Sequence, residues 1–358
     1  MAVYYLSMTC RCAWHNLPKA VMFMRPGQPW SIHTVPAPFR YRLLVPWLAG
    51  QLPFTAETSL SGITYASLAI SYFIVLLSSR RLGLSAGASV CGLALAYVFE
   101  PNVFNYYHPF LADGFSLMVI AVMLYALAIE SFWMFAVFGV CGVFAREVIL
   151  VLLPVWCARD VRRGVALTVM ASIALLIERS LLFGPPDTVD PMRILMARLH
   201  HPENFGIDIL ATWGWAFAVT ALGISLLPAR SFRAIGPMSL GLCAAALGSY
   251  LLATDLMRLF GILIPIVAIA ATRLVAVLAE RRQRILLTSL CGLIALQFFV
   301  SGGTRLSHNP AALAAAVRPM RLGLVWTIAV VFILRREFAH SIREKLWVTE
   351  GSENTNSV

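Results

Sequence analysis

Apolar stretches separated by short polar or basic segments run along the chain from residue 60 onward. A helix that crosses a bilayer needs about 20 apolar residues, or about 17 at the short end, and several of these stretches fall below that length. The pattern predicts an all-α fold, a polytopic transmembrane helical bundle of about 10–11 membrane segments, some of them short or broken. The apolar stretches are 60–79, 84–99, 113–129, 132–145, 148–158, 165–183, 207–227, 234–253, 258–277, 285–300 and 320–334.

Composition supports the same class of protein. Of the 358 residues, 59% are hydrophobic and only 13% are charged, and the charged share is about half that of a soluble domain. This balance excludes a soluble domain, a secreted disulfide scaffold and a disordered chain. The net charge of +11 does not indicate a nucleic-acid partner, because the basic residues form short runs between apolar stretches, where membrane topology places them.

The basic runs predict the orientation of the chain. They fall on alternate sides of the apolar stretches and so face one compartment, which the positive-inside rule makes cytoplasmic. We therefore expect a multi-pass protein of the plasma (inner) membrane with a cytoplasmic C-terminus, whose loops 100–112, 184–206 and 301–319 face outward. The basic runs are Arg80–Arg81, Arg159/Arg162/Arg163, Arg230/Arg233, Arg281/Arg282/Arg284 and the group Arg335, Arg336, Arg343 and Lys345.

This alternation requires a break within residues 132–158. If that region were one tilted helix, the next basic run, which begins at Arg159, would lie outside and every later run would change sides. We predict that a helix rises from a cytoplasmic turn near Glu130, breaks at Arg146–Glu147 and returns as a short segment. Irregular backbone at membrane depth is tolerated where protein or water surrounds it.

The chain divides into three parts: an outer or interfacial segment over 1–57, a transmembrane domain over 58–345 and a polar cytoplasmic tail over 346–358. The topology places residue 57 outside, although basic residues precede it. Two explanations stay open: an initial helix lies upstream of this sequence, or the segment enters in another way. Residues 39–54 alternate basic, aromatic and apolar positions and predict an amphipathic helix in the outer membrane interface.

Several ionisable residues fall inside the apolar segments, where each costs at least about 2.5 kcal/mol on the insertion scale. Arg146 and Glu147 lie about 14 residues past the cytoplasmic turn, roughly 21 Å along a helix. The remaining members of this set lie at a similar height. Their shared depth predicts a polar cavity that opens outward. The full set is Asp113, Arg146, Glu147, Glu178, Arg179, Asp255 and Arg258.

Each of these residues also has a structural interpretation. The Arg146–Glu147 and Glu178–Arg179 dipeptides can form buried ion pairs between helices. The i,i+3 spacing of Asp255 and Arg258 suits a pair on one helix face, and Asp113 suits a helix N-cap. His108 and Glu57 are interpreted as ordinary loop residues, and Gly83 and Gly87 form a G-x-x-x-G that favours close helix packing.

Other chemistries lack their sequence signals. The chain contains no P-loop, H-E-x-x-H, G-x-S-x-G or strand-following G-x-G-x-x-G motif. Five cysteines sit in or beside apolar stretches as small hydrophobic residues, and Cys10 and Cys12 have no second ligand pair at metal-site spacing. We predict no metal ligands; no cofactor is assigned, and a divalent cation is left open.

Three stretches resemble the C-class of integral-membrane glycosyltransferases, the polyprenyl-phosphate-sugar-dependent enzymes that include dolichyl-phosphate-mannose mannosyltransferase-like bacterial proteins. The first has an Asp before an inward helix, and the second has a helix broken at a basic residue. The third has a polar pair, an Arg, and then a Pro with small residues. Together with the interfacial FRYRLLVPWLAG, they are HPFLADGFSLMVIAVMLYALAIE, FWMFAVFGVCGVFAREVILVLLPVWCARDVRR and TDLMRLFGILIPIVAIAATRL.

The resemblance implies transfer of a sugar from a lipid phosphate to an acceptor hydroxyl, with inversion, at the outer face of the membrane. A carboxylate acts as the general base, and a cation stabilises the departing phosphate. Arg146 matches the basic residue at the helix break and is assigned to the phosphate, with Arg258 as the second candidate. Asp113 or Glu57 is assigned as the base or acceptor-orienting group. The residues predicted to line the site are Glu147, Glu178, Arg179, Asp255 and His108.

A non-enzymatic protein is the alternative. A lipid or polymer carrier, a flippase or an envelope-assembly protein would use the same cavity for an anionic headgroup. On either interpretation the partners are a lipid-linked sugar and membrane lipids, and the oligomeric state is left open.

Overall fold

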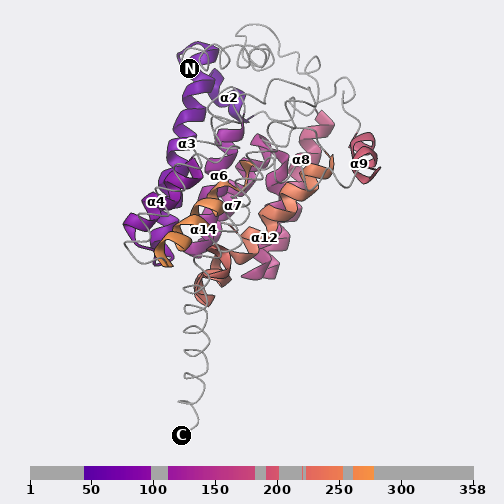
Figure 1. The fold of residues 1–358 in the computed structure, drawn as a ribbon. Coiled ribbons are helices and arrows are strands. Elements are labelled where there is room, and N and C mark those ends of the chain that lie inside the picture. Colours follow the sequence, from indigo (N-terminus) through magenta and orange to yellow (C-terminus); the bar gives the residue numbers. More distant parts are fainter. Residues whose placement is uncertain are drawn as a thin grey trace.

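The computed structural model describes residues 44–97, 112–181, 191–200, 220, 223–252 and 261–277, and 88% of these residues are helical, with no strand among them. This confirms the all-α prediction for the described part of the chain. The elements run in the order α2 (Leu44–Gly50), α3 (Ala56–Arg81), α4 (Ala86–Tyr97), α6 (Asp113–Ala128), α7 (Phe132–Ala145), the 3₁₀ helix η3 (Glu147–Ala158), α8 (Val161–Leu181), α9 (Pro191–His200), α12 (Ala229–Leu252) and α14 (Ile264–Val277) (Figure 1).

Three helices are long and apolar enough to cross a membrane, namely Thr58–Arg81, Val161–Leu181 and Ser231–Leu251. At the helical rise, 21 residues extend about 31 Å, which matches the hydrocarbon thickness of roughly 30 Å. Four shorter apolar helices accompany them: α6, α7, η3 and α14. The total of 10–11 membrane segments stays a prediction.

One side of α8 is apolar and exposed, as expected of a surface in contact with lipid rather than water. A soluble protein seldom leaves such a continuous strip of large apolar side chains uncovered. The strip comprises Val165, Val169, Met170, Ile173, Leu176, Ile177 and Leu181.

The chain from α6 to α8 forms an up-and-down meander with the predicted break at its centre. α7 ends at Ala145, Arg146 adopts an extended backbone (φ −161°, ψ 121°), and η3 begins at Glu147. An exposed ion pair joins the two turns at one end of the meander. Glu130, in the turn between α6 and α7, lies 2.7 Å from Arg159, in the turn after η3. The break at Arg146–Glu147 is therefore confirmed.

The return segment η3 is a 3₁₀ helix of 12 residues. Its rise of about 2.0 Å per residue gives a length of about 24 Å, against about 21 Å for the 14 α-helical residues of α7. The tighter helix lets a shorter sequence match its neighbour. Its burial repeats every three residues: Val151 and Pro154 lie in the exposed column, and the other two columns are buried at Ile149, Leu152, Leu153, Val155 and Trp156.

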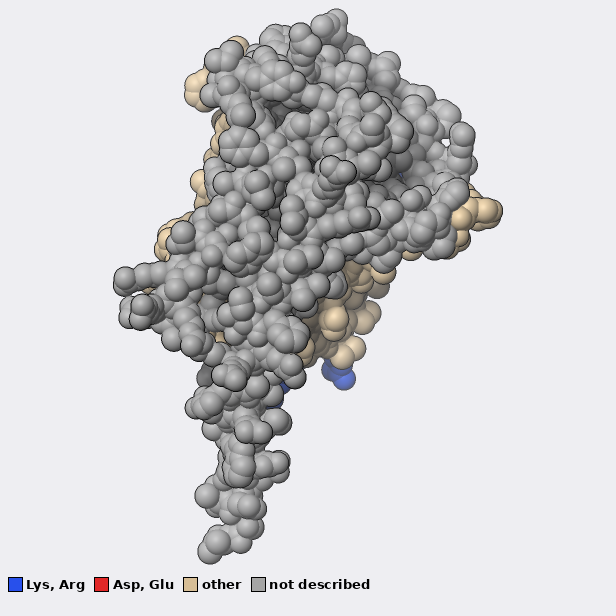
Figure 2. Space-filling view, viewed as in Figure 1, with Lys and Arg blue, Asp and Glu red and all other residues tan. Residues whose placement is uncertain are grey.

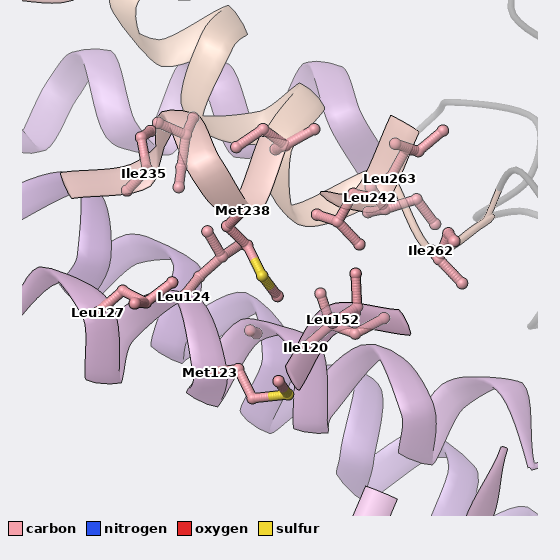
Figure 3. Close-up of a cluster of buried hydrophobic side chains, with 14 of the residues drawn as sticks. Ile120, Met123, Leu124, Leu127, Leu152, Ile235, Met238, Leu242, Ile262 and Leu263 are labelled. Carbon is pink, nitrogen blue, oxygen red and sulfur yellow. The ribbon is translucent and has the colours of Figure 1, made fainter. Parts of the chain in front are cut away.

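The core forms where α12 crosses the meander. Ile235, Met238 and Leu242 of α12 point toward Leu124 of α6 and Leu152 of η3 (Figure 3). Helix α14 packs on α4 and α3, and its residues from Ile264 to Thr272 are all buried. A helix that is apolar all round is expected at such a central position.

Glycines set the closest helix contacts. A methyl group at Gly142 of α7 would come within 2.6 Å of Val119 and 2.8 Å of Ile149, so α6 and η3 both require a bare backbone there. The predicted packing role of Gly83 and Gly87 is wrong, because a Cβ at either position meets nothing within 4 Å. Gly83 instead takes a left-handed backbone (φ 81°) after α3, which glycine adopts without steric cost.

The basic runs gather at one end of the bundle. Thr64 lies against Gly114 and Ser71 donates a hydrogen bond to the Leu117 carbonyl, so α3 and α6 run parallel. Helix α3 therefore ends at Arg80–Arg81 near the level of the Glu130 turn. Ser231, at the start of α12, donates a hydrogen bond to the Leu82 carbonyl, which places the Arg230/Arg233 run at that end too. In Figure 2, Lys and Arg atoms appear at the lower edge of the coloured part of the chain. The shared side is thus observed for these runs, whereas its assignment to the cytoplasm stays a prediction.

A short helix caps the opposite end. The predicted amphipathic segment 39–54 contains α2, whose Val45 and Ala49 are buried against Leu60 of α3 and Ala145 of α7, while Trp47 is exposed. The apolar face of α2 is thus buried against α3 and α7, and its place in a membrane interface stays a prediction.

We expect matched glycine substitutions to have opposite effects. Gly142→Ala inserts a methyl group into the α6–η3 contact and should destabilise the fold by about 1–3 kcal/mol. Gly87→Ala enters open space on a helix and should be neutral or stabilising by up to about 1 kcal/mol. Thermal unfolding of both variants in the same detergent measures the difference. Equal effects would contradict the packing described for Gly142.

Candidate functional site

Ionisable side chains from three parts of the meander meet at the end of the bundle opposite the basic runs. Asp113 is the first residue of α6, Arg146 and Glu147 form the break, and Arg179 lies in the last turn of α8. Because α7 and η3 run antiparallel to their neighbours, these positions share one level. The predicted common depth of this group is therefore observed for the described members, which we call the ionic cluster: Asp113, Arg146, Glu147, Glu178 and Arg179.

The centre of the ionic cluster is a buried ion pair between Asp113 and Arg146. Arg146 Nη1 lies 2.8 Å from Asp113 Oδ1, and the two residues are only 5% and 3% exposed. The N-cap of α6 is Ala112, and no side chain caps it, so the N-cap interpretation of Asp113 is wrong. The carboxylate turns to Arg146 because a buried guanidinium needs a charged partner more than a helix end needs a cap.

The surrounding apolar residues keep water from this pair. Ala145, which precedes Arg146, is fully buried beneath Val45 and Ala49 of α2. Ala112, which precedes Asp113, packs on the same cluster. Helix α2 thus covers the residues next to both partners, and electrostatic interactions strengthen where water is excluded.

A second pair links η3 to α8. Arg179 Nη2 lies 3.9 Å from Glu147 Oε1, and the side chains are 46% and 19% exposed. This contact realises the predicted interhelical pairing, but between Glu147 and Arg179. Ion pairs of this exposure contribute about 0–1 kcal/mol. Arg179 is the more exposed of the two guanidinium groups in the ionic cluster.

Glu178 occupies the buried side of α8. It is 8% exposed, and among the described residues neither carboxylate oxygen has a hydrogen-bond partner. Glu178 continues the buried stripe of α8 that packs on η3. At the basic end of this stripe, Gly164 lies against Cys157. At its other end, Glu178 lies near the level of Glu147. The 14 residues from 164 to 178 rise about 21 Å, and the ten from 147 to 157 rise about 20 Å as a 3₁₀ helix.

The remaining predicted site residues are placed less completely. Glu57 lies in the first turn of α3, not in a loop, and its side chain lies outside the described part. His108, Asp255 and Arg258 fall outside the described residues. The joint approach of Arg258 to the ionic cluster, and the outward-opening cavity, stay predictions.

A metal site is not evident in the part that the structure describes. No group of three or more His, Cys, Asp or Glu side chains is placed there to hold a metal ion. The arrangement instead offers guanidinium groups beside carboxylates at one bundle end. Guanidinium groups bind phosphate and carboxylate oxygens through two parallel hydrogen bonds. In the ionic cluster, Arg146 and Arg179 carry these groups, and each guanidinium faces a carboxylate, Asp113 or Glu147.

The two pairs of the ionic cluster should respond differently to loss of their arginine. Arg146→Gln leaves Asp113 buried and unpaired and should cost about 3–5 kcal/mol of stability. Arg179→Gln removes a half-exposed partner and should cost less than about 1 kcal/mol. Chemical or thermal unfolding of the two variants checks this order. Similar losses would mean that the Asp113–Arg146 pair is not buried as described.

Comparison with known proteins adds no relative. No family model, no curated protein and no solved structure matches this chain.

Proposed function

We propose that this protein is a membrane-embedded, glycosyltransferase-like protein that binds a lipid-phosphate-linked sugar at the end of the bundle opposite its basic runs. The observation that carries the proposal is the ionic cluster, which gathers at a break in the transmembrane meander. Charges at such depth are rare and are retained where a function needs them. The basic runs at the other end support an outward-facing site in the plasma (inner) membrane.

The phosphate contact is assigned first to Arg179. Its guanidinium is half exposed, so an anion at this end of the bundle can reach it. Arg146 was the first choice from sequence, but it is buried against Asp113. We propose that it becomes the second phosphate donor when α2 moves aside. Arg258 remains a further candidate.

The acceptor side is assigned to carboxylates at the same bundle end. Asp113 holds Arg146, so we propose a positioning role for it. Glu57, in the first turn of α3, is kept as the general base that takes the proton from the acceptor hydroxyl. The sugar then passes to that oxygen with inversion, and the lipid phosphate departs against a guanidinium group.

The test uses purified protein in lipid nanodiscs with a panel of polyprenyl-phosphate sugars. Arg179→Lys keeps the charge but loses the fork that binds two oxygens, so affinity for the phosphate should fall about tenfold, equal to about 1.4 kcal/mol. Arg163→Lys, an exposed change at the basic end, is the matched control and should bind normally. Unchanged binding in Arg179→Lys would contradict the assignment.

The same assay separates the enzyme from a carrier. An enzyme should transfer the sugar, and Glu57→Gln should bind the donor while losing most transfer. Binding without transfer to any acceptor, in the wild type as well as in Glu57→Gln, would favour a lipid or polymer carrier over a glycosyltransferase.

A further inference from the structure

One member of the ionic cluster, Glu178, is not explained by phosphate binding. The buried stripe of α8 consists of Gly164, Leu167, Ala171 and Leu175, and it ends at Glu178. At 8% exposure, and with no hydrogen-bond partner among the described residues, its carboxylate is placed where an apolar residue is expected. A carboxylate in such a position must be neutralised, because burying an isolated charge is very costly.

Among the described residues, the charged groups that face Glu178 do not provide that neutralisation. Helix η3 carries one carboxylate, Glu147, whose charge has the same sign, and one thiol, Cys157, at the basic end. Arg179, the next residue along α8, extends its guanidinium to Glu147 and is half exposed. Helix α7 has no Asp, Glu, Lys, Arg or His, its Cys141 is exposed, and Arg146 at its end is engaged by Asp113.

The ionic cluster has fewer positive than negative groups. The ionic cluster contains three carboxylates and two guanidinium groups, so full ionisation leaves one surplus negative charge. Each guanidinium already has a carboxylate, and the carboxylate left over is Glu178, which is itself buried. A single proton removes the surplus. A divalent cation would bring one positive charge more than the surplus requires. The described residues also place no group of three His, Cys, Asp or Glu side chains to bind one.

We infer that Glu178 and Glu147 form a proton-binding site, in which Glu178 carries the proton at neutral pH. The protonated carboxyl is neutral and fits the apolar contact between α8 and η3. Loss of the proton places two negative charges across that contact, which weakens it. The packing of these two helices is therefore linked to the pH of the compartment that this bundle end faces. The inference does not depend on the glycosyltransferase proposal.

The stability of the folded protein depends on pH through this proton. The folded state holds the proton and the unfolded state releases it more readily, so stability falls as pH rises until Glu178 is ionised. In Glu178→Gln the neutral amide replaces the neutral carboxyl, and this part of the pH dependence disappears. We expect the wild-type melting temperature to fall by about 2–4 °C between acidic and alkaline pH and that of Glu178→Gln to stay level.

Infrared spectroscopy of the purified protein in nanodiscs observes the proton directly. The wild type should show the C=O stretch of a protonated carboxyl at neutral pH, and Glu178→Gln should lack it. Glu130→Gln, an exposed change at the basic end, is the control and should keep the band. Glu147→Gln removes the like charge and frees Arg179, so the band should titrate at lower pH; this variant decides the matter if Glu178→Gln does not fold.

Absence of the band in the wild type at neutral pH, or its persistence in Glu178→Gln, would overturn the inference. So would a wild-type melting temperature that rises with sodium or magnesium ions at alkaline pH but not in Glu178→Gln, because the site would then hold a metal cation.

Discussion

The buried ion pair between Asp113 and Arg146 is the interaction on which the arrangement of the bundle depends. It joins the first residue of α6 to the break between α7 and η3, two points separated by 33 positions, at a distance of 2.8 Å. Arg146 leaves the helix, and its backbone and charge must be satisfied without water. Asp113 provides the charge, and α2 covers the apolar residues beside it. The start of α6 and the break between α7 and η3 are thereby held at the same height along the bundle.

The length of η3 follows from the same constraint. After the break at Arg146, the chain returns to the level of Glu130 within 12 residues, where Arg159 contacts that carboxylate. An α-helix of that length covers about 18 Å, and a 3₁₀ helix covers about 24 Å. The meander therefore uses the more extended helix, although long 3₁₀ segments are uncommon. The price is poorer hydrogen-bond geometry, offset by two buried columns of apolar side chains.

The sequence predicted the helices well, since apolar stretches mark α3, α6, α7 and α8 within a few residues of their bounds. The break at Arg146 was also predictable, because without it the basic runs would not all face the same compartment. The 3₁₀ form of η3 was not, since EVILVLLPVWCA is apolar on every face and carries no period. The partner of Arg146 was missed as well: Asp113 resembles a helix cap, and only the antiparallel return of α7 brings it near.

Asp113 and Arg146 neutralise each other inside the bundle. A double-mutant cycle with Asp113→Asn and Arg146→Gln measures this most directly. We expect a coupling free energy of about 1–3 kcal/mol, because the double variant leaves no unpaired buried charge. Effects that add to within about 0.5 kcal/mol would show that the two side chains do not interact and would contradict the account.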